Sequence, residues 1–322
     1  LMTEGRIAEN EWERLFYVLA LQCTGAVQAA RWSTIKGGGG YIYSFNGPHS
    51  LFVDTIRSLR ALAVSHLHGH VLMGENDQRI SLLDRLIAHG EATAKYNVFY
   101  GNGRDSYDVR GRVAHESVFN RNDGQFRCPS SQQGYSPFTT WTRGAAWIIC
   151  GYAEQLEFLD TVKGADLDAV GGRRAVTDLF LETAKATSDY YIDGYSAKNG
   201  IPYWDSCALN THQLGDFTKK DAQPYNDHEP VDSSAAAIAA RRAGSVVRLY
   251  ASAMFSSVPV RSTAPVADRL TEIPNLSSSA FPEPIFFAIM KMAPAPLSAP
   301  IPKASSAYVN RDASCADAPV TR

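Results

Sequence analysis

Six stretches of this chain place apolar residues at helical spacing, with long polar loops between them. The spacing predicts helices over about 11–32, 51–72, 78–96, 140–162 and 173–191, and a sixth that starts after 232–234, DSS. The loops 33–50, 101–138 and 194–231 are rich in Gly, Asn, Asp, Ser and Pro. Loops of this length are uncommon in a compact domain unless they carry function. We therefore expect an all-α fold, because helices joined by alternately short and long loops suit an α/α toroid.

Charge is nearly balanced along the chain, with a formal net charge of −2. The longest basic runs are pairs, such as Arg173-Arg174 and Arg241-Arg242. A nucleic-acid groove needs basic residues concentrated on one face, so we expect no nucleic-acid partner. The apolar stretch 281–301 carries Glu283, Lys291 and several prolines, so we expect no membrane span.

The cysteines give a hint about compartment. There are five, with no C-x-x-C pair: Cys23, Cys128, Cys150, Cys207 and Cys315. The odd number and the spacing argue against a disulfide framework and against a zinc site. Free thiols in a reducing compartment are the simplest interpretation, and residues 1–14 are polar and acidic rather than a signal peptide. We therefore expect a cytoplasmic protein.

Two further patterns are typical of bound ions or cofactors, and neither is complete. His66 and His70 lie four residues apart on a predicted helix, as metal ligands often do, but no third ligand follows nearby. The run Gly37–Gly40 has no Lys-Ser/Thr after it, which argues against a phosphate loop. We expect neither a metal nor a cofactor.

The composition changes after about residue 240. Residues 241–322 hold ten of the 16 prolines and one of the 24 glycines, and helical periodicity fades there. The sequence thus predicts an α/α domain over 1–240 and a Pro/Ala/Ser-rich tail over 241–322. Two interpretations of the tail stay open: a disordered segment, or an out-of-frame translation of a helical ending.

The segment 140–147 combines residue types suited to an acidic sugar. Arg143 and Trp147 lie four residues apart, near the start of a predicted helix. An arginine can bind a carboxylate with two parallel hydrogen bonds, an indole offers a flat apolar platform, and free N–H groups at a helix start favour an anion. The alternative is that Trp147 belongs to the core and Arg143 pairs with a structural carboxylate.

Residues 139–153, TTWTRGAAWIICGYA, resemble the S-T-W-T-R-G-x-A-W and G-[FY]-A signature of unsaturated glucuronyl hydrolases, glycoside hydrolase family 88. The unsaturated rhamnogalacturonyl hydrolases, family 105, are related. Other family motifs recur here in the same order: His115, Gln133-Gly134, 202–205 (PYWD) and 232–235 (DSSA). The resemblance spans about residues 35–240 and implies an (α/α)6-barrel of six helical hairpins.

By this resemblance Asp54 is the catalytic acid–base residue. The segment 53–59, VDTIRSL, fits the family's I-D-x-x-x-N-L-x-x-L helix start, and 75–77, END, fits the turn after it. The resemblance also implies a substrate-binding set of His115, Gln133, Trp141, Arg143 and Trp147. Without it, Asp54 is an ordinary acidic residue at a helix entry, favoured by the helix dipole.

The implied substrate is an oligosaccharide with a 4,5-unsaturated uronic acid at its non-reducing end. Hydration of its vinyl ether double bond releases the next sugar, and Asp54 must be protonated at rest, as a desolvated site favours. Two departures stand out. The family's H-D-[LI]-G-F motif does not occur in residues 1–50, and its closing helices, with their aromatic and Gly-rich substrate loop, have no recognisable counterpart after residue 240. Val231 also replaces the Arg that often precedes D-S-S. We therefore expect a barrel that is incomplete at both ends.

Two other functions stay open. One is an inverting α/α-barrel glycosidase on saturated sugars, which needs a second carboxylate such as Asp205 or Asp232 facing the cleft of Asp54. We interpret both as positional. The other is a degenerate, non-catalytic sugar-binding protein. The sequence leaves the oligomeric state and the parent polysaccharide undetermined.

Overall fold

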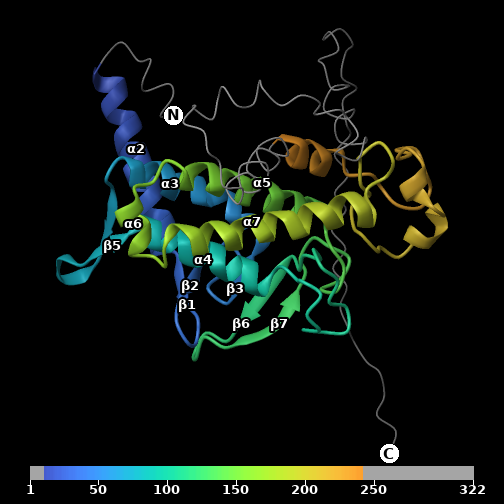
Figure 1. Cartoon of the computed structure of the whole chain (residues 1–322), viewed down its shortest axis with the longest axis horizontal. Helices are drawn as coiled ribbons and strands as arrows, with labels where there is room; N and C mark the ends of the chain where they lie inside the picture. The colour runs from blue at the N-terminus through green and yellow to red at the C-terminus, as the bar shows by residue number, and fades with distance from the viewer. Residues whose placement is uncertain (1–10, 242–322) are drawn as a thin grey trace, which may run out of the picture.

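A computed structural model describes residues 11–241, in which helices dominate and three small antiparallel sheets lie at the periphery (Figure 1). The long helices are α2 (Glu11–Ala30), α3 (Leu59–Leu67), α4 (Leu82–Tyr96), α5 (Thr142–Leu159) and α7 (Arg173–Tyr190). Residues 233–241 are also helical. The short helical turns are η1 (Val53–Ser58), η2 (Glu75–Asp77), α6 (Gly164–Asp168), η3 (Tyr191–Tyr195), η4 (Thr211–Leu214) and η5 (Phe217–Lys219).

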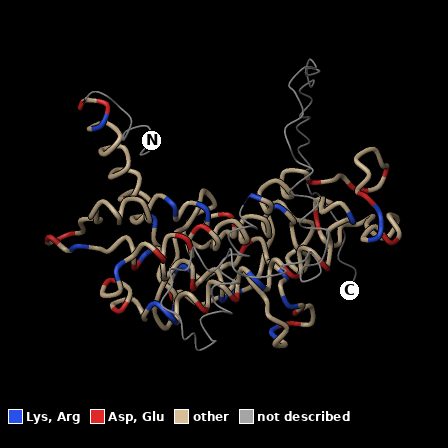
Figure 2. Tube along the Cα trace, turned by 45° about the horizontal axis from the view of Figure 1, so that its top comes forward, with Lys and Arg blue, Asp and Glu red and all other residues tan. Residues whose placement is uncertain are grey.

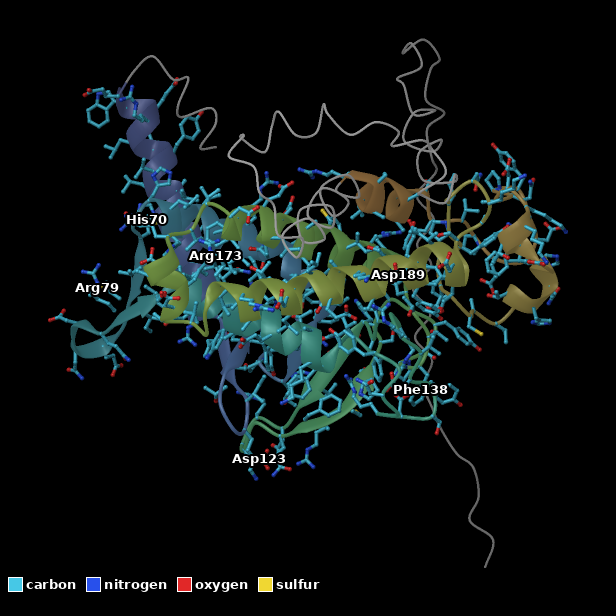
Figure 3. The ribbon with its side chains drawn as sticks, viewed as in Figure 1. His70, Arg79, Asp123, Phe138, Arg173 and Asp189 are labelled. Atoms are coloured by element: carbon cyan, nitrogen blue, oxygen red, sulfur yellow. The ribbon has the colours of Figure 1, made fainter. Side chains whose placement is uncertain are left out.

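The strands form two hairpins and one three-stranded sheet. They are β1 (Trp32–Thr34), β2 (Gly40–Ile42), β3 (Ser50–Phe52), β4 (Val71–Met73), β5 (Arg79–Ser81), β6 (Glu116–Phe119) and β7 (Phe126–Ser130). β1 pairs with β2, β4 with β5, and β6 lies between β3 and β7. The β4–β5 hairpin, marked by Arg79 in Figure 3, extends away from the helices.

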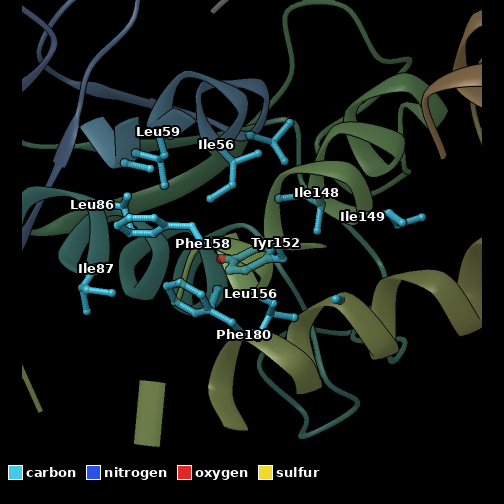
Figure 4. Close-up of a cluster of buried hydrophobic side chains, with 14 of the residues drawn as sticks. Ile56, Leu59, Leu86, Ile87, Ile148, Ile149, Tyr152, Leu156, Phe158 and Phe180 are labelled. Atoms are coloured by element: carbon cyan, nitrogen blue, oxygen red, sulfur yellow. The ribbon is translucent and has the colours of Figure 1, made fainter. Parts of the chain in front are cut away.

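Helix α5 is at the centre of the packing. It contacts α7, α3 and η1, while α3 also packs on α2 and α4, and α4 packs on α7. Buried aliphatic and aromatic side chains from these elements form one core (Figure 4). Within it, the ring of Tyr152 meets that of Phe180 edge to face, and the Tyr152 hydroxyl donates to the carbonyl of Gly90 at 2.6 Å. The core therefore joins α5, α7 and α4 around one buried, fully bonded tyrosine.

Two glycines of α5 let this helix approach η1 closely. A Cβ at Gly151 would stand 2.6 Å from a Cγ atom of Ile56, and one at Gly144 would stand 3.1 Å from a Cγ atom of Val53. Side chains at these positions would push the two elements apart, because interiors are close-packed. The Gly144 and Gly151 positions of the 139–153 segment thus set the distance between α5 and the turn that carries Asp54.

The predicted helices are present, with two corrections. The expected helix over 78–96 begins at Leu82, because residues 79–81 form β5. The expected helix over 51–72 is interrupted: residues 50–52 form β3, 53–58 form a 3-10 turn, and only 59–67 are α-helical. All three residues of β3 are buried, so its apolar side chains merged with the helical pattern that follows. The helices match part of an (α/α)6-barrel, and ring closure lies beyond what residues 11–241 show. Apart from residue 241, the predicted tail lies outside the described residues.

Two other findings concern the described residues. None of the helices within 11–241 has both the length and the apolar character that crossing a bilayer requires. Cys23, Cys128, Cys150 and Cys207 are not joined by disulfides, and Cys315 lies outside the described range.

At the outer face of α7, Arg110 pairs with Glu182 at 2.8 Å and with Asp189, marked in Figure 3, at 3.0 Å. These pairs hold the 101–112 loop against the helix.

His89 predicts an acid-sensitive fold. Its ring is fully buried, Nδ1 accepts the N–H of Ile42 at 3.0 Å, and burial lowers the pKa of His89 to about 3. The unfolded chain takes up a proton below about pH 6.5 that the folded protein does not bind until near pH 3, so stability is lost as pH falls through this window. We expect the free energy of unfolding in urea to fall by about 1.4 kcal/mol from this group between about pH 7.5 and about pH 5.5.

His89→Asn keeps an acceptor for the Ile42 N–H and cannot titrate, so it should flatten this pH dependence. The exposed His212 supplies the control, since His212→Asn should leave the slope unchanged. An unaltered slope in His89→Asn would contradict the assignment.

Candidate active site

Asp54 is the second residue of η1, directly after β3. Its side chain is 18% exposed, and its Oδ1 lies 3.7 Å from Nε2 of His115, whose side chain is 1% exposed. Both atoms are buried, and neither has a hydrogen-bond partner among the described residues. The separation is longer than a hydrogen bond and short enough for strong electrostatic coupling. Asp54 Oδ1 and His115 Nε2 are thus two buried polar atoms that face each other and have no hydrogen bond to any other described residue.

The pKa of Asp54 contradicts the expectation of a protonated resting state. Burial alone would raise this pKa, but the facing His115, the main chain of η1 and the guanidinium of Arg57 favour the carboxylate and bring the pKa below its ordinary value. Composition and spacing do not reveal such a balance, because it depends on which groups the fold places opposite the carboxyl. Asp54 is therefore a carboxylate in the free protein.

His115 is fixed by rings and by main-chain donors. Its ring lies 5.0 Å from that of Phe52 and 4.8 Å from that of Trp141, measured between centroids. Nδ1 accepts the backbone N–H of Gln132 at 3.0 Å and that of Gln133 at 3.3 Å. Two donors on Nδ1 require a lone pair there, so the ring proton sits on Nε2 and faces Asp54.

Three segments identified in the sequence lie side by side. Thr142 Oγ1 donates to the carbonyl of Tyr203 at 2.8 Å, and Trp141 forms a β-bridge with Asp205. Tyr203 in turn bridges to Val231. The 139–153, 202–205 and 232–235 segments are thus joined by main-chain bonds, although about 60 residues separate the first from the second. The fold therefore brings the three segments together at the start of α5.

Arg143 lies at the start of α5, as predicted, and is already engaged by a carboxylate. Its Nε donates to Oδ2 of Asp232 at 3.0 Å, and its guanidinium lies 5.4 Å from the Trp141 ring centroid. The Arg143 side chain is 44% exposed, whereas that of Asp232 is 3% exposed. A pair with a structural carboxylate was one of the two alternatives drawn from the sequence. Because the guanidinium is partly exposed, the pairing leaves a cationic group at the surface beside Trp141.

Trp147 lies one turn further along α5, and its ring is covered by a different arginine. The guanidinium of Arg57, on η1, stands 4.5 Å from the Trp147 ring centroid. Trp147 also packs against the core, and Trp141 is buried at 6% exposure. Neither indole therefore offers an open platform, and each supports a guanidinium instead. The pattern missed Arg57 because its contact is with α5, 90 residues away.

The side chain of Gln133 is exposed. Gln133 contacts the site through its main-chain N–H, which donates to His115 Nδ1. The sequence analysis also missed Glu116, which is 1% exposed. Burial alone would raise its pKa, but donors that include Ser50, Gln132 and Asn46 bring it below the ordinary value. The position of Glu116 directly after His115 can be read from the sequence. Its burial cannot, because burial depends on the fold.

Asp205 and Asp232 are saturated by structural bonds. Asp205 accepts the N–H of Tyr135 at 2.9 Å and that of Cys207 at 3.1 Å, while burial raises its pKa. Asp232 caps the last described helix by accepting the N–H of Ala235 at 2.9 Å. Both carboxylates thus have positional partners, and neither supplies the second, free carboxylate that an inverting glycosidase needs.

Acidic and basic residues are interspersed along the described trace (Figure 2). Within residues 11–241 no three His, Cys, Asp or Glu side chains gather in a way that would hold a metal ion. His66 instead lies 4.0 Å from Asp166, and the rings of His68 and His70 are 6.0 Å apart.

The sequence and the fold of this chain are similar to those of known proteins. No protein-family model matches the chain. An unsaturated glucuronyl hydrolase from Formosa agariphila is 26% identical over 153 residues, which cover 47% of this chain and 28% of that protein. A solved unsaturated glucuronyl hydrolase specific for heparin is 18% identical, with a TM-score of 0.51 over 76% of this chain and 52% of its own. One from Streptococcus agalactiae is 17% identical, with a TM-score of 0.49, and covers 90% and 54%.

The chain is a distant homologue of unsaturated glucuronyl hydrolases. It spans about half the length of the solved structures it matches, and 28% of the length of the Formosa agariphila protein. The likeness to the heparin-specific hydrolase supports the fold, a partial (α/α)6-barrel.

The Asp54–His115 pair predicts a pKa that depends on the imidazole. His115→Phe keeps an aromatic ring between Phe52 and Trp141 but removes the group that favours the carboxylate, so the pKa of Asp54 should rise. An NMR titration of the Asp54 carboxyl carbon measures it directly. His212→Phe, at an exposed position in the 211–214 turn, should leave the Asp54 titration where it is. An Asp54 pKa that stays the same or falls in His115→Phe would show that the two side chains are not coupled.

Proposed function

We propose that this distant homologue of unsaturated glucuronyl hydrolases removes a 4,5-unsaturated uronic acid from the non-reducing end of lyase-generated oligosaccharides. The observation that supports this most is the Asp54–His115 pair, two buried polar atoms 3.7 Å apart with no other described partners. Burying polar atoms without hydrogen bonds lowers the stability of the fold. Titratable groups in such surroundings are concentrated at functional sites. Arg57 and Arg143 add cationic groups that suit an acidic sugar.

The chemistry needs one proton donor and one proton acceptor. Protonation of C4 of the unsaturated ring leaves positive charge shared between C5 and the ring oxygen. Water then adds to C5 and gives up a proton, and the resulting hemiketal opens and releases the next sugar. A single carboxyl group can donate the first proton and accept the second, so the spacing rules for paired carboxylates do not apply. Asp54 is the group that we assign to both steps.

The lowered pKa of Asp54 suits the accepting step, and the substrate supplies what the donating step needs. A uronate that binds beside Asp54 brings a second negative charge into the same buried region. A nearby like charge disfavours the carboxylate and raises its pKa. In this mechanism Asp54 takes up its proton as the substrate arrives, and His115 directs its Nε2–H to the carboxylate that remains after proton transfer.

Arg143 is assigned to the uronate carboxylate. Its Nε is held by Asp232, which fixes the plane of the guanidinium, and the partly exposed side chain presents its remaining N–H donors. Trp141 lies beneath the guanidinium and limits its movement. A planar, pre-positioned guanidinium suits a carboxylate better than a flexible ammonium group does.

Asp54→Asn tests the catalytic assignment. We expect kcat on an unsaturated uronyl disaccharide to fall by at least about 100-fold, because the amide neither donates nor accepts the proton. The loss of ultraviolet absorbance that accompanies loss of the double bond measures the rate. Asp178→Asn is the matched control, since that side chain is 68% exposed on α7 and pairs only loosely with Arg174.

Two outcomes would contradict the proposal. Unchanged turnover in Asp54→Asn would remove Asp54 from the reaction. Saturable binding of the disaccharide without turnover by the unaltered chain would replace hydrolysis with sugar binding as the function.

Arg143→Lys tests recognition of the acid group. With the free uronate as substrate, we expect kcat/KM to fall about tenfold or more, because a bidentate contact is lost. The methyl ester of the same substrate should be affected much less, since it carries no charge for Arg143 to bind. Equal losses for acid and ester would mean that Arg143 acts only as a structural partner of Asp232.

A further inference from the structure

Gln132 connects His115 to a second buried carboxylate. Its main-chain N–H donates to His115 Nδ1 at 3.0 Å, and its side-chain Nε2 donates to Oε2 of Glu116 at 3.2 Å. Glu116 follows His115 directly in the sequence, at the start of β6. One residue of the 131–135 loop is therefore bonded to two consecutive residues of another segment, through main chain and side chain together.

Glu116 is itself held rigidly. Its Oε1 accepts Nδ2 of Asn46 at 2.7 Å and the hydroxyl of Ser50, while Oε2 accepts Gln132. Burial alone would raise its pKa, but these donors keep the carboxylate charged. A charged acceptor makes stronger hydrogen bonds than a neutral one, and it is hard to displace once its donors are in place.

The loop depends on such an anchor. Gln132 and Gln133 are both exposed, and they follow the end of β7 without regular structure. Within the segment, the N–H of Gly134 donates to the Ser131 hydroxyl at 2.9 Å, which closes a turn around Gln132 and Gln133 but does not connect it to His115. Further along, Tyr135 is held by Asp205, but the Gln132 side chain is the contact nearest to His115.

We propose that Glu116 is a positioning residue for the catalytic pair. By holding the side chain of Gln132, it keeps two N–H groups on His115 Nδ1, which places the ring proton on Nε2 and aims it at Asp54. Glu116 and Gln132 thereby select the His115 tautomer without touching the reacting atoms. This inference rests on the proposed function in one respect: the proposed function is what assigns Asp54 and His115 to the reaction.

Gln132→Glu is the sharpest test. It keeps the size of the side chain and the main-chain N–H, but it sets a carboxylate against Glu116, so the loop should be pushed off His115. NMR scalar coupling across the hydrogen bond, between the Gln132 amide nitrogen and His115 Nδ1, reports the contact directly. We expect this coupling to disappear, and hydrogen exchange of the amide at position 132 to become about tenfold faster or more, since a bond to a charged acceptor is lost.

The reversed pair supplies the rescue. In the double variant Glu116→Gln and Gln132→Glu, the amide at 116 can donate to the carboxylate at 132, while its oxygen still accepts from Asn46 and Ser50. Coupling and exchange protection should return. Asn46→Ala is the matched control, because it removes a donor to the same Glu116 carboxylate without touching the link to His115, and should retain the coupling. Gln132→Ala, a milder change at an exposed position, should lose it as Gln132→Glu does.

Retention of the coupling in both Gln132→Glu and Gln132→Ala would overturn the proposal, as would failure of the reversed pair to restore it. These measurements need no substrate. If the chain turns over no unsaturated disaccharide, the proposed function fails while the coupling still decides the role of Glu116. If it does turn over, kcat should fall in Gln132→Glu and recover in the reversed pair.

Discussion

The pairing of β3 with β6 is the constraint on which the candidate site depends. Phe52 lies opposite Glu116, and the N–H of Val53 donates to the carbonyl of His115 at 3.0 Å. Because side chains alternate along a strand, a slip of one residue would turn Asp54 or His115 to the other face. A three-residue strand holds this register because α5, through Gly144 and Gly151, presses on the turn that follows it. The short sheet and the central helix together place one carboxyl opposite one imidazole.

The carboxylates of residues 11–241 differ in how far hydrogen bonds satisfy them. The four buried ones, Glu116, Asp205, Glu229 and Asp232, each accept at least two hydrogen bonds from the main chain or from nearby side chains. A buried charge needs such partners, since leaving it without them costs several kcal/mol. Asp54 differs from these four: its side chain is 18% exposed, and its one buried oxygen, Oδ1, is faced only by His115 Nε2, at 3.7 Å. The contrast separates residues that shape the site from the one we assign to chemistry.

The features predicted from the sequence are those that a local pattern encodes, such as helical spacing or the order of motifs. The long helices followed from apolar spacing, and Asp54, His115, Trp141 and Arg143 followed from motif order. The structure links these four through His115, which meets Asp54 on one side and Trp141 on the other. Strand β3 was hidden because three buried residues directly before a helical turn extend the helical pattern.

Glu116 and Arg57 were missed for a different reason. Their importance lies in burial and in partners far along the chain, such as Trp147 for Arg57, and no local pattern encodes these. The direction of the Asp54 pKa shift was missed for the same reason. Desolvation was foreseen, but no sequence pattern measures the strength of the opposing groups, and these outweigh desolvation.

The arrangement of charges suggests why a carboxylate at rest is compatible with acid chemistry. Arg57 and Arg143 are each backed by an indole; Arg143 pairs with Asp232, and Arg57 attracts the Asp54 carboxylate. The positive charges therefore suit a carboxylate, which Asp54 supplies in the free protein. An entering uronate competes for the same positive potential, so it weakens the stabilisation of the Asp54 carboxylate and favours its protonation. In the proposed reaction the acidic group of the substrate then has two roles: it is bound by the protein, and it affects catalysis. Its charge sets the protonation state of Asp54, the residue that donates a proton to C4 of the double bond, so neutral sugars would be poor substrates even where they fit.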